Sequence, residues 1–151
     1  MTGLINAVPV ANKDDYKNVG VYLEHKGEEI KRSSLEMIGI GKQLADKVHE
    51  KLICVITGDK VDKLAKDAGE YGCDIVLAAE APEFKDVLTL PIAEVVGKYI
   101  QDYKPNIFLL SATRNGRDLA SRIAIRARTG ITADCTVIDV DENRILLANR
   151  P

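Results

Sequence analysis

Short apolar runs that alternate with helical patterns constrain the fold of this chain more than any other feature. The runs are rich in β-branched and aliphatic residues and are bounded by turn residues, at 19–23, 52–57, 75–79, 107–111, 136–140 and 145–148. Apolar residues recur at helical spacing between them, in 33–50, 59–69, 91–103 and 117–129. This alternation predicts the α/β class, as a Rossmann-like three-layer α/β/α sandwich with a mostly parallel sheet.

The two ends of the chain depart from this alternation. Residues 1–17 have no clear period and predict an irregular arm, whereas 141–143 predicts a turn between the last two runs. We therefore expect an antiparallel edge hairpin near the C-terminus. A length of 151 residues fits a single domain over 1–151, with the α/β part at 18–151.

Composition excludes several classes of partner. The 21 basic and 23 acidic residues give a net charge of -2, so nothing in the charge favours binding to nucleic acid. No run approaches the roughly 20 apolar residues of a membrane helix, and the first residues lack the features of a signal peptide. We expect a cytoplasmic protein without membrane insertion. Cys54, Cys73 and Cys135 match neither a redox pair nor a zinc site and are expected to be small buried thiols.

Local signals suggest where helices begin and how they pack. Ser33 with Glu36 forms a capping-box pattern, and Asp59 is placed to cap the next helix. Gly39 and Gly41 each weaken the first helix by up to about 1 kcal/mol relative to alanine. They indicate either close packing on the sheet or a tolerated defect.

The turn at 111–118 follows a predicted buried strand and is the first place to expect a ligand, because ligands bind at the carboxyl ends of strands in open α/β sheets. Asn115 with Asp118 resembles an N-cap pair, and free N–H groups at Gly116 and Arg117 could receive an anion. Asp118 argues against this, because the helix would supply its own anion. The candidate cofactor-binding residues are Ser111, Thr113, Asn115, Gly116 and Arg117.

Five of the eight arginines lie in the segment 114–128. One interpretation is a surface that binds an acidic partner, a carboxylate or a phosphate, with Arg117, Arg122, Arg126 and Arg128 as candidate partner-binding residues. The other is a solvated helix face whose arginines pair with Asp118 and Asp134. The sequence favours neither.

Common catalytic and cofactor motifs are missing. The first strand leads to Glu24 and His25 without a GxGxxG pattern, and no P-loop or nucleophile elbow occurs. His25 and His49 lie in polar surroundings, without ligands at metal-binding spacing, and are expected at the surface. We predict no metal site and no self-sufficient enzyme active site.

Several segments together resemble the amino-terminal domain of the electron transfer flavoprotein alpha subunit. They are NVGVYLEHKGEEIKRSSLEMIGIGKQLAD, YGCD, KPNIFLLSATRNGRDLASRIAIRARTGITADCT and the closing ANRP. The most specific parts are Thr113, Gly116, Arg117, Asp118, Leu119 and Ala120 in the turn and helix, and the segment 129–136.

This resemblance implies an alpha–beta heterodimer that passes electrons from acyl-CoA or other dehydrogenases to an acceptor through FAD. In the family, a carboxy-terminal domain of alpha mainly holds the FAD, and the AMP or second flavin belongs to the beta subunit. The expected function is a non-enzymatic scaffold and dimerisation domain, with no cofactor on this chain alone.

Two alternatives stay open. The first is a stand-alone adenine-nucleotide-binding domain of Rossmann-like fold that uses the turn 111–116 for phosphate, although 129–132 only loosely approximates a second phosphate loop. The second is a fragment with no activity of its own.

Overall fold

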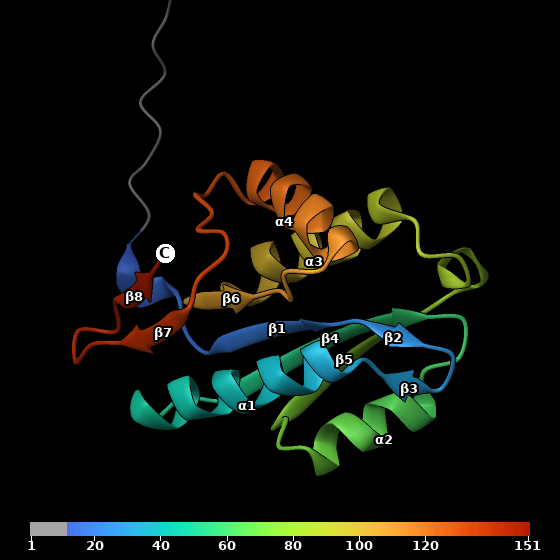
Figure 1. Ribbon diagram of the computed structural model, residues 1–151, viewed down its shortest axis with the longest axis horizontal. Coiled ribbons are helices and arrows are strands. Elements are labelled where there is room, and N and C mark those ends of the chain that lie inside the picture. Colours follow the sequence, from blue (N-terminus) through green and yellow to red (C-terminus); the bar gives the residue numbers. More distant parts are fainter. Residues whose placement is uncertain (1–11) are drawn as a thin grey trace, which may run out of the picture.

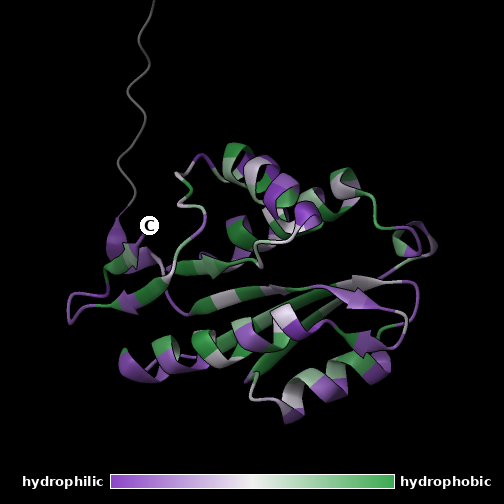
Figure 2. Ribbon diagram, in the orientation of Figure 1, coloured by the Kyte–Doolittle hydropathy of each residue, from purple (hydrophilic) through white to green (hydrophobic). Residues whose placement is uncertain are grey.

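A computed structural model describes residues 12–151 and confirms the α/β class (Figure 1). Four parallel strands form the main sheet in the order β5-β4-β1-β6. They are β1 (Val19–Leu23), β4 (Leu52–Gly58), β5 (Ile75–Glu80) and β6 (Ile107–Leu109). The central strands β1 and β4 are buried along their whole length and are largely hydrophobic (Figure 2). Continuous apolar runs are typical of parallel strands that are covered on both faces.

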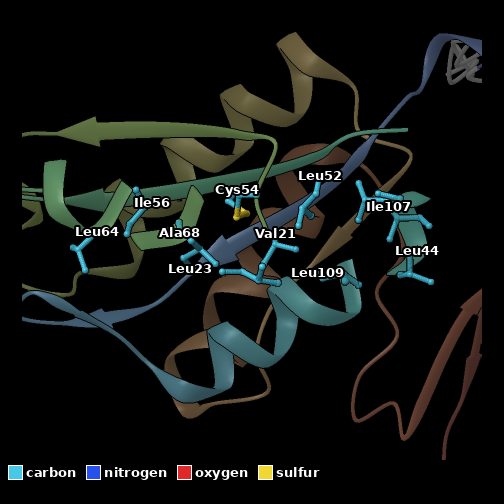
Figure 3. Packing of buried hydrophobic residues seen from close by; sticks show 14 of the residues in the cluster. Val21, Leu23, Leu44, Leu52, Cys54, Ile56, Leu64, Ala68, Ile107 and Leu109 are labelled. Atoms are coloured by element: carbon cyan, nitrogen blue, oxygen red, sulfur yellow. A yellow bond between two sulfur atoms is a disulfide. The ribbon is translucent and has the colours of Figure 1, made fainter. Parts of the chain in front are cut away.

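Two pairs of helices cover the two faces of this sheet. Helices α1 (Arg32–Lys47) and α2 (Asp62–Glu70) lie on one face, and α3 (Thr89–Tyr103) and α4 (Arg114–Ala127) lie on the other (Figure 1). Each face has its own core. Side chains that alternate along β1 show this, because Val21 packs with α1 and α2 (Figure 3) whereas Tyr22 packs with α3 and α4. The predicted three-layer sandwich is therefore confirmed.

Shorter elements lie at the ends of the sheet. The hairpin of β2 (His25–Lys26) and β3 (Glu29–Ile30) follows β1, and the 3-10 helix η2 (Pro82–Phe84) follows β5. The predicted C-terminal antiparallel hairpin consists of β7 (Val137–Val140) and β8 (Leu146–Asn149) and forms a separate two-stranded sheet. Residues 1–11 of the predicted arm lie outside the described residues, and the rest of the arm contains the 3-10 helix η1 (Lys13–Asp15).

The turn of the C-terminal hairpin is held against the amino ends of the parallel strands. The Arg144 guanidinium pairs with Glu50 at 2.8 Å and donates a hydrogen bond to the carbonyl of Tyr16. The Asn106 amide donates to the Arg144 carbonyl at 2.9 Å. The hairpin is thus joined to three segments that are distant in sequence.

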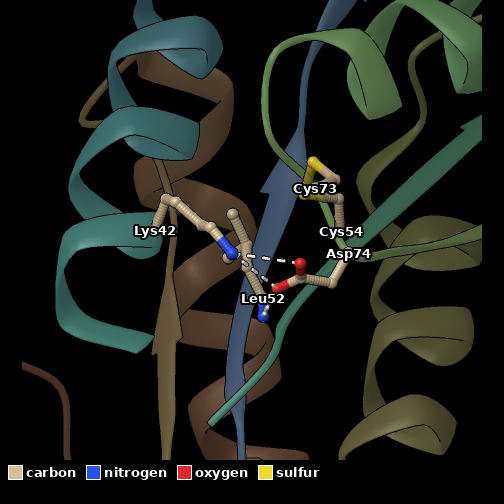
Figure 4. Close-up of a disulfide and its surroundings, with 5 residues drawn as sticks. All are labelled: Lys42, Leu52, Cys54, Cys73 and Asp74. Atoms are coloured by element: carbon tan, nitrogen blue, oxygen red, sulfur yellow. Dashed lines mark hydrogen bonds and ion pairs between the residues drawn. A yellow bond between two sulfur atoms is a disulfide. The ribbon is translucent and has the colours of Figure 1, made fainter. Parts of the chain in front are cut away.

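The prediction of three buried thiols is wrong, because two of the cysteines are buried but not thiols and the third is a thiol that is only half-buried. Cys54 on β4 and Cys73, just before β5, form a disulfide (Figure 4). Parallel pairing of β4 with β5 brings these residues together across 19 positions of sequence, which their spacing alone did not indicate. Cys135 is a free, half-buried cysteine.

Asp74 follows the disulfide and joins β4 to α1. Its carboxylate accepts hydrogen bonds from the Leu52 amide at 2.8 Å and from Lys42 at 3.0 Å (Figure 4). Burial alone would raise the pKa of Asp74, but these hydrogen bonds lower it below its usual value. The ionised carboxylate therefore fits this position.

The predicted helix caps of α1 and α2 are wrong. Helix α1 begins after Lys31, so Ser33 and Glu36 form no capping box. Helix α2 begins after Val61 without a side-chain cap from Asp59, and the Glu80 carboxylate instead accepts the Val61 N–H at 3.1 Å.

Helix α4 begins three residues earlier than predicted, with Thr113 rather than Asn115 as its N-cap. The Thr113 hydroxyl accepts a hydrogen bond from the Gly116 N–H at 2.9 Å. The contact at the start of α2 thus comes from a residue distant in sequence, whereas the cap of α4 is local.

The two alternatives for the glycines of α1 both occur. A Cβ atom added to Gly41 would lie 2.8 Å from Leu52 and 2.9 Å from Val21, so the helix packs closely on the sheet there. A Cβ atom on Gly39 would meet nothing within 4 Å. Gly41 serves packing, and Gly39 is the tolerated defect.

Candidate functional site

The candidate site is the crevice at the carboxyl ends of β1 and β6. The chain passes from β1 to β4 on one side of β1 and later returns to β6 on its other side, so strand order reverses at this point. Ligands of open α/β sheets usually bind at such a switch point, where helices that follow the strands begin. Here those helices are α1 and α4.

Glu24 is the central residue of this crevice, and the sequence analysis did not select it. It directly follows β1 and is only 7% exposed. The Thr113 hydroxyl donates to its carboxylate, with oxygen–oxygen distances of 2.8 and 3.0 Å, and the Lys31 ammonium lies at 3.6 Å. The sequence offered one signal for Glu24, namely a charged residue directly after a fully apolar strand. A charged residue at such a position is rarely buried unless it is paired, so a search for its partner would have pointed to this crevice.

The backbone of Glu24 is bound as firmly as its side chain. Its N–H donates to the Ser34 hydroxyl at 2.8 Å, and its carbonyl accepts from the Lys31 N–H at 2.9 Å. Ser34 and Lys31 lie at the start of α1, and Thr113 lies at the start of α4. Glu24 therefore bridges the starts of the two helices that flank the switch point.

A small cavity of about 30 Å³ opens beside Glu24. Residues of both polar and apolar character line it: Tyr22, Glu24, His25, Lys31, Thr57, Phe84, Val87, Thr89, Ile92, Asn115 and Leu119. The Tyr22 hydroxyl is 2.9 Å from the Thr57 hydroxyl. Burial raises the pKa of Tyr22, and the hydrogen bond with Thr57 lowers it by less. The resulting pKa is about 12.

The two histidines differ in exposure. His49 is exposed, as expected for a surface histidine. His25 is half-buried at the cavity, with its Nδ1 atom 2.9 Å from the Gly27 carbonyl and its Nε2 atom 2.7 Å from the Thr57 carbonyl. His25 thus ties the β2–β3 hairpin to the end of β4.

The predicted cofactor-binding residues lie in one turn but do not face one site. Ser111 is buried, and its hydroxyl has no hydrogen-bond partner within residues 12–151. Thr113 binds Glu24, and Asn115 lines the cavity. Gly116 is pressed against the backbone, since an added Cβ atom would lie 2.0 Å from the Ser111 carbonyl oxygen. Arg117 pairs with Asp134 at 2.8 Å, outside the set of residues that line the cavity.

The arginines of α4 divide between the two interpretations. Arg117 pairs with Asp134, and Arg122 pairs with Asp118 at 3.1 Å, as the solvated-face interpretation expected. The side chain of Arg126 lies over Gly97 of α3, where an added Cβ atom would be 3.2 Å from Arg126 Cδ. Arg128 is exposed and forms no ion pair with any residue that the structure describes.

The cavity in this crevice is much smaller than a typical pocket for a flavin or a nucleotide. Ligand pockets of that kind usually have volumes of roughly 300–1,000 Å³, whereas the cavity beside Glu24 measures about 30 Å³. The carboxylate of Glu24 also lies at the start of α4, where a phosphate would need to bind. Nor do the described residues contain a group of three or more potential metal ligands among their His, Cys, Asp and Glu side chains.

A family model described as the electron transfer flavoprotein domain matches residues 19–151, which is nearly the whole chain. The chain belongs to the electron transfer flavoprotein family. The predicted resemblance to alpha subunits is also confirmed. An electron transfer flavoprotein subunit alpha from Clostridium acetobutylicum is 44% identical over 93% of this chain and 42% of its own length.

Two further relatives are named as subunits of enzymes. The acryloyl-CoA reductase electron transfer subunit beta of Anaerotignum propionicum is 36% identical over 89% of this chain and 36% of its own length. The lactate dehydrogenase (NAD(+),ferredoxin) subunit LctC of Acetobacterium woodii is 35% identical over 93% of this chain and 34% of its own length. The chain thus spans less than half the length of the curated relatives it matches. Within residues 12–151, no helix is both long and apolar enough to cross a membrane.

Proposed function

We propose that this chain is the amino-terminal scaffold and dimerisation domain of an electron transfer flavoprotein alpha-type subunit, and that it pairs with a beta-type subunit. The observation that carries the proposal is the 44% identity to an alpha subunit over 93% of the chain. The chain then works as part of an electron carrier and catalyses no reaction alone. One relative is named as the electron transfer subunit beta of acryloyl-CoA reductase, in agreement with this role.

The outer face of α4 is the surface that we assign to the beta-type subunit. Ile125 lies in the last turn of α4 and is 78% exposed, the highest value among the large hydrophobic residues described. Arg122 and Arg128 lie three residues to either side of it. Arginines are enriched among the residues that dominate binding energy in interfaces, and a partner could bury the apolar side chain between them. The candidates Arg117, Arg122, Arg126 and Arg128 thus stay in the proposal, with Ile125 as the anchor.

FAD belongs, in this proposal, to the complete heterodimer and is held mainly by the part of the alpha subunit that this chain does not span. The small cavity and the buried Glu24 support this assignment, because neither leaves room for a flavin in this crevice. Acyl-CoA or other dehydrogenases would contact the complete complex, in the cytoplasm.

Gel filtration with absorbance detection tests the proposal. This chain would be run alone, with a beta-type subunit from the same organism, and with that subunit plus FAD. We expect a colourless peak that shifts to the elution volume of a heterodimer and carries no flavin absorbance. No shift with the beta-type subunit would refute pairing. A yellow peak from this chain alone would refute the placement of FAD.

The alternative of a stand-alone adenine-nucleotide-binding domain is disfavoured. The turn 111–116 is closed by Thr113 and by the contact of Gly116 with Ser111, and the carboxylate of Glu24 would repel a phosphate. Calorimetric titration with AMP and ATP separates the two functions. We expect no heat of binding below millimolar concentrations, and micromolar binding would favour the alternative.

A further inference from the structure

Glu24 has an unusual set of contacts for a residue at the end of a strand. It is 7% exposed, and a buried carboxylate is costly unless charged or polar groups surround it. Its partners are a threonine hydroxyl that also caps α4 and a lysine that precedes α1. Both partners belong to helix starts rather than to the strand itself.

The carboxylate of Glu24 lies where a ligand anion would be expected in an open α/β sheet. The amino end of a helix carries a partial positive charge and unpaired N–H groups, which favour a negatively charged group. Two helices, α1 and α4, begin beside Glu24, at the switch point of the sheet. In nucleotide-binding folds of this architecture, a phosphate group binds at a helix start in this part of the sheet. Glu24 supplies the negative charge from within the chain.

We propose that Glu24 is a resident anion that determines specificity: its carboxylate occupies the switch-point crevice, joins the starts of α1 and α4, and excludes phosphate-bearing ligands. The crevice without this carboxylate becomes a site for small anions, either carboxylates or inorganic phosphate. This inference does not depend on pairing with a beta-type subunit.

Replacement of Glu24 tests this inference by chemical rescue. Glu24→Gly removes the carboxylate and leaves Thr113 and Lys31 to face an empty space. We expect its melting temperature to fall by roughly 5 °C, and sodium acetate or phosphate to restore at least half of this loss. Sodium chloride at equal ionic strength should restore much less. Because phosphate stabilises folded proteins in general, the wild-type chain should also gain some stability, but less than Glu24→Gly gains.

A matched control comes from Glu80, whose carboxylate caps the start of a single helix at an exposed position. Glu80→Gly should show no specific response to acetate or phosphate. If Glu24→Gly responds no more than wild type or Glu80→Gly, the inference is wrong.

A second variant covers the case in which Glu24→Gly does not fold. Glu24→Gln keeps the size of the side chain and a hydrogen-bond acceptor but removes its charge. We expect inorganic phosphate to raise the melting temperature of Glu24→Gln by more than it raises that of wild type at the same concentration. Equal responses of the two proteins would overturn the inference. Failure of the wild-type chain to bind a beta-type subunit would refute only the function proposed above.

Discussion

Tyr22 is buried at the carboxyl end of β1, where its hydroxyl group contacts Thr57. Burial raises its pKa from 10.0 to about 12. The folded protein thus favours the neutral phenol, so the contribution of Tyr22 to stability is complete below pH 10 and is lost as the pH rises through 12.

Between pH 10 and 12, the free energy of unfolding of wild type should fall by about 2 kcal/mol relative to Tyr22→Phe. Denaturant titrations of both proteins across this range measure the difference. The ultraviolet absorbance of tyrosinate checks that Tyr22 is the cause. The absorbance change that Tyr22 contributes at high pH should be missing in the variant. Parallel pH profiles for the two proteins would contradict the prediction.

Gly39 and Gly41 provide a matched pair of positions on one helix. Gly39→Ala should raise the free energy of unfolding by about 0.5–1 kcal/mol, because alanine favours the helix and the new methyl group meets no neighbour. Gly41→Ala should lower it by about 1–3 kcal/mol, because the methyl group would overlap Leu52 and Val21 in the core. Urea denaturation of the two variants measures both values. Effects of the same sign would show that α1 does not pack on the sheet as described.

At the scale of elements, the disulfide between Cys54 and Cys73 links the centre of β4 to the turn before β5. It encloses α2 in a loop with a sequence separation of 19. Loop-closure entropy predicts a stabilisation of about 3 kcal/mol for a loop of this size. Reduced protein should therefore unfold at a lower temperature than oxidised protein.

Calorimetry with and without dithiothreitol measures that difference, and thiol titration of the denatured oxidised protein should find Cys135 alone. Cys135→Ala is the control, since it should leave the effect of the reductant unchanged. Three free thiols in oxidised protein would contradict the disulfide. Because disulfides are rare in the cytosol, the state of this bond in cells also tests the proposed cytoplasmic location.

At the scale of the whole molecule, helices α3 and α4 form one outer layer, and α1 and α2 form the other (Figure 1). If α4 docks the beta-type subunit, Ile125→Asp should weaken pairing by more than about tenfold, because an apolar anchor would become a buried charge. Tyr71→Asp is the matched control. Tyr71 is 58% exposed and lies at the end of α2, in the other layer.

Calorimetric titration of the beta-type subunit into each variant measures the dissociation constant. Unchanged affinity for Ile125→Asp would remove the outer face of α4 from the interface. Equal losses for Ile125→Asp and Tyr71→Asp would indicate a general effect of added charge.

The periodicity of the sequence was enough to predict the layers of this protein. Apolar runs such as 19–23 and 52–57 are local patterns, and each marks a strand whose two faces must both be covered. The spacing of apolar residues likewise located all four long helices, although their first residues were displaced by up to three positions. Patterns of this kind depend only on neighbours along the chain.

The tertiary structure alone decided the contacts that close the crevice and that hold the start of α2. Glu24 meets Thr113 across 89 positions of sequence, and Glu80 rather than Asp59 accepts the N–H of Val61, just before α2. The pairing of Cys54 with Cys73 likewise follows from the strand register. A buried charge or thiol finds its partner only when the sheet is assembled, so the sequence predicted where the crevice lies, whereas the fold decided that a carboxylate of the chain itself fills it.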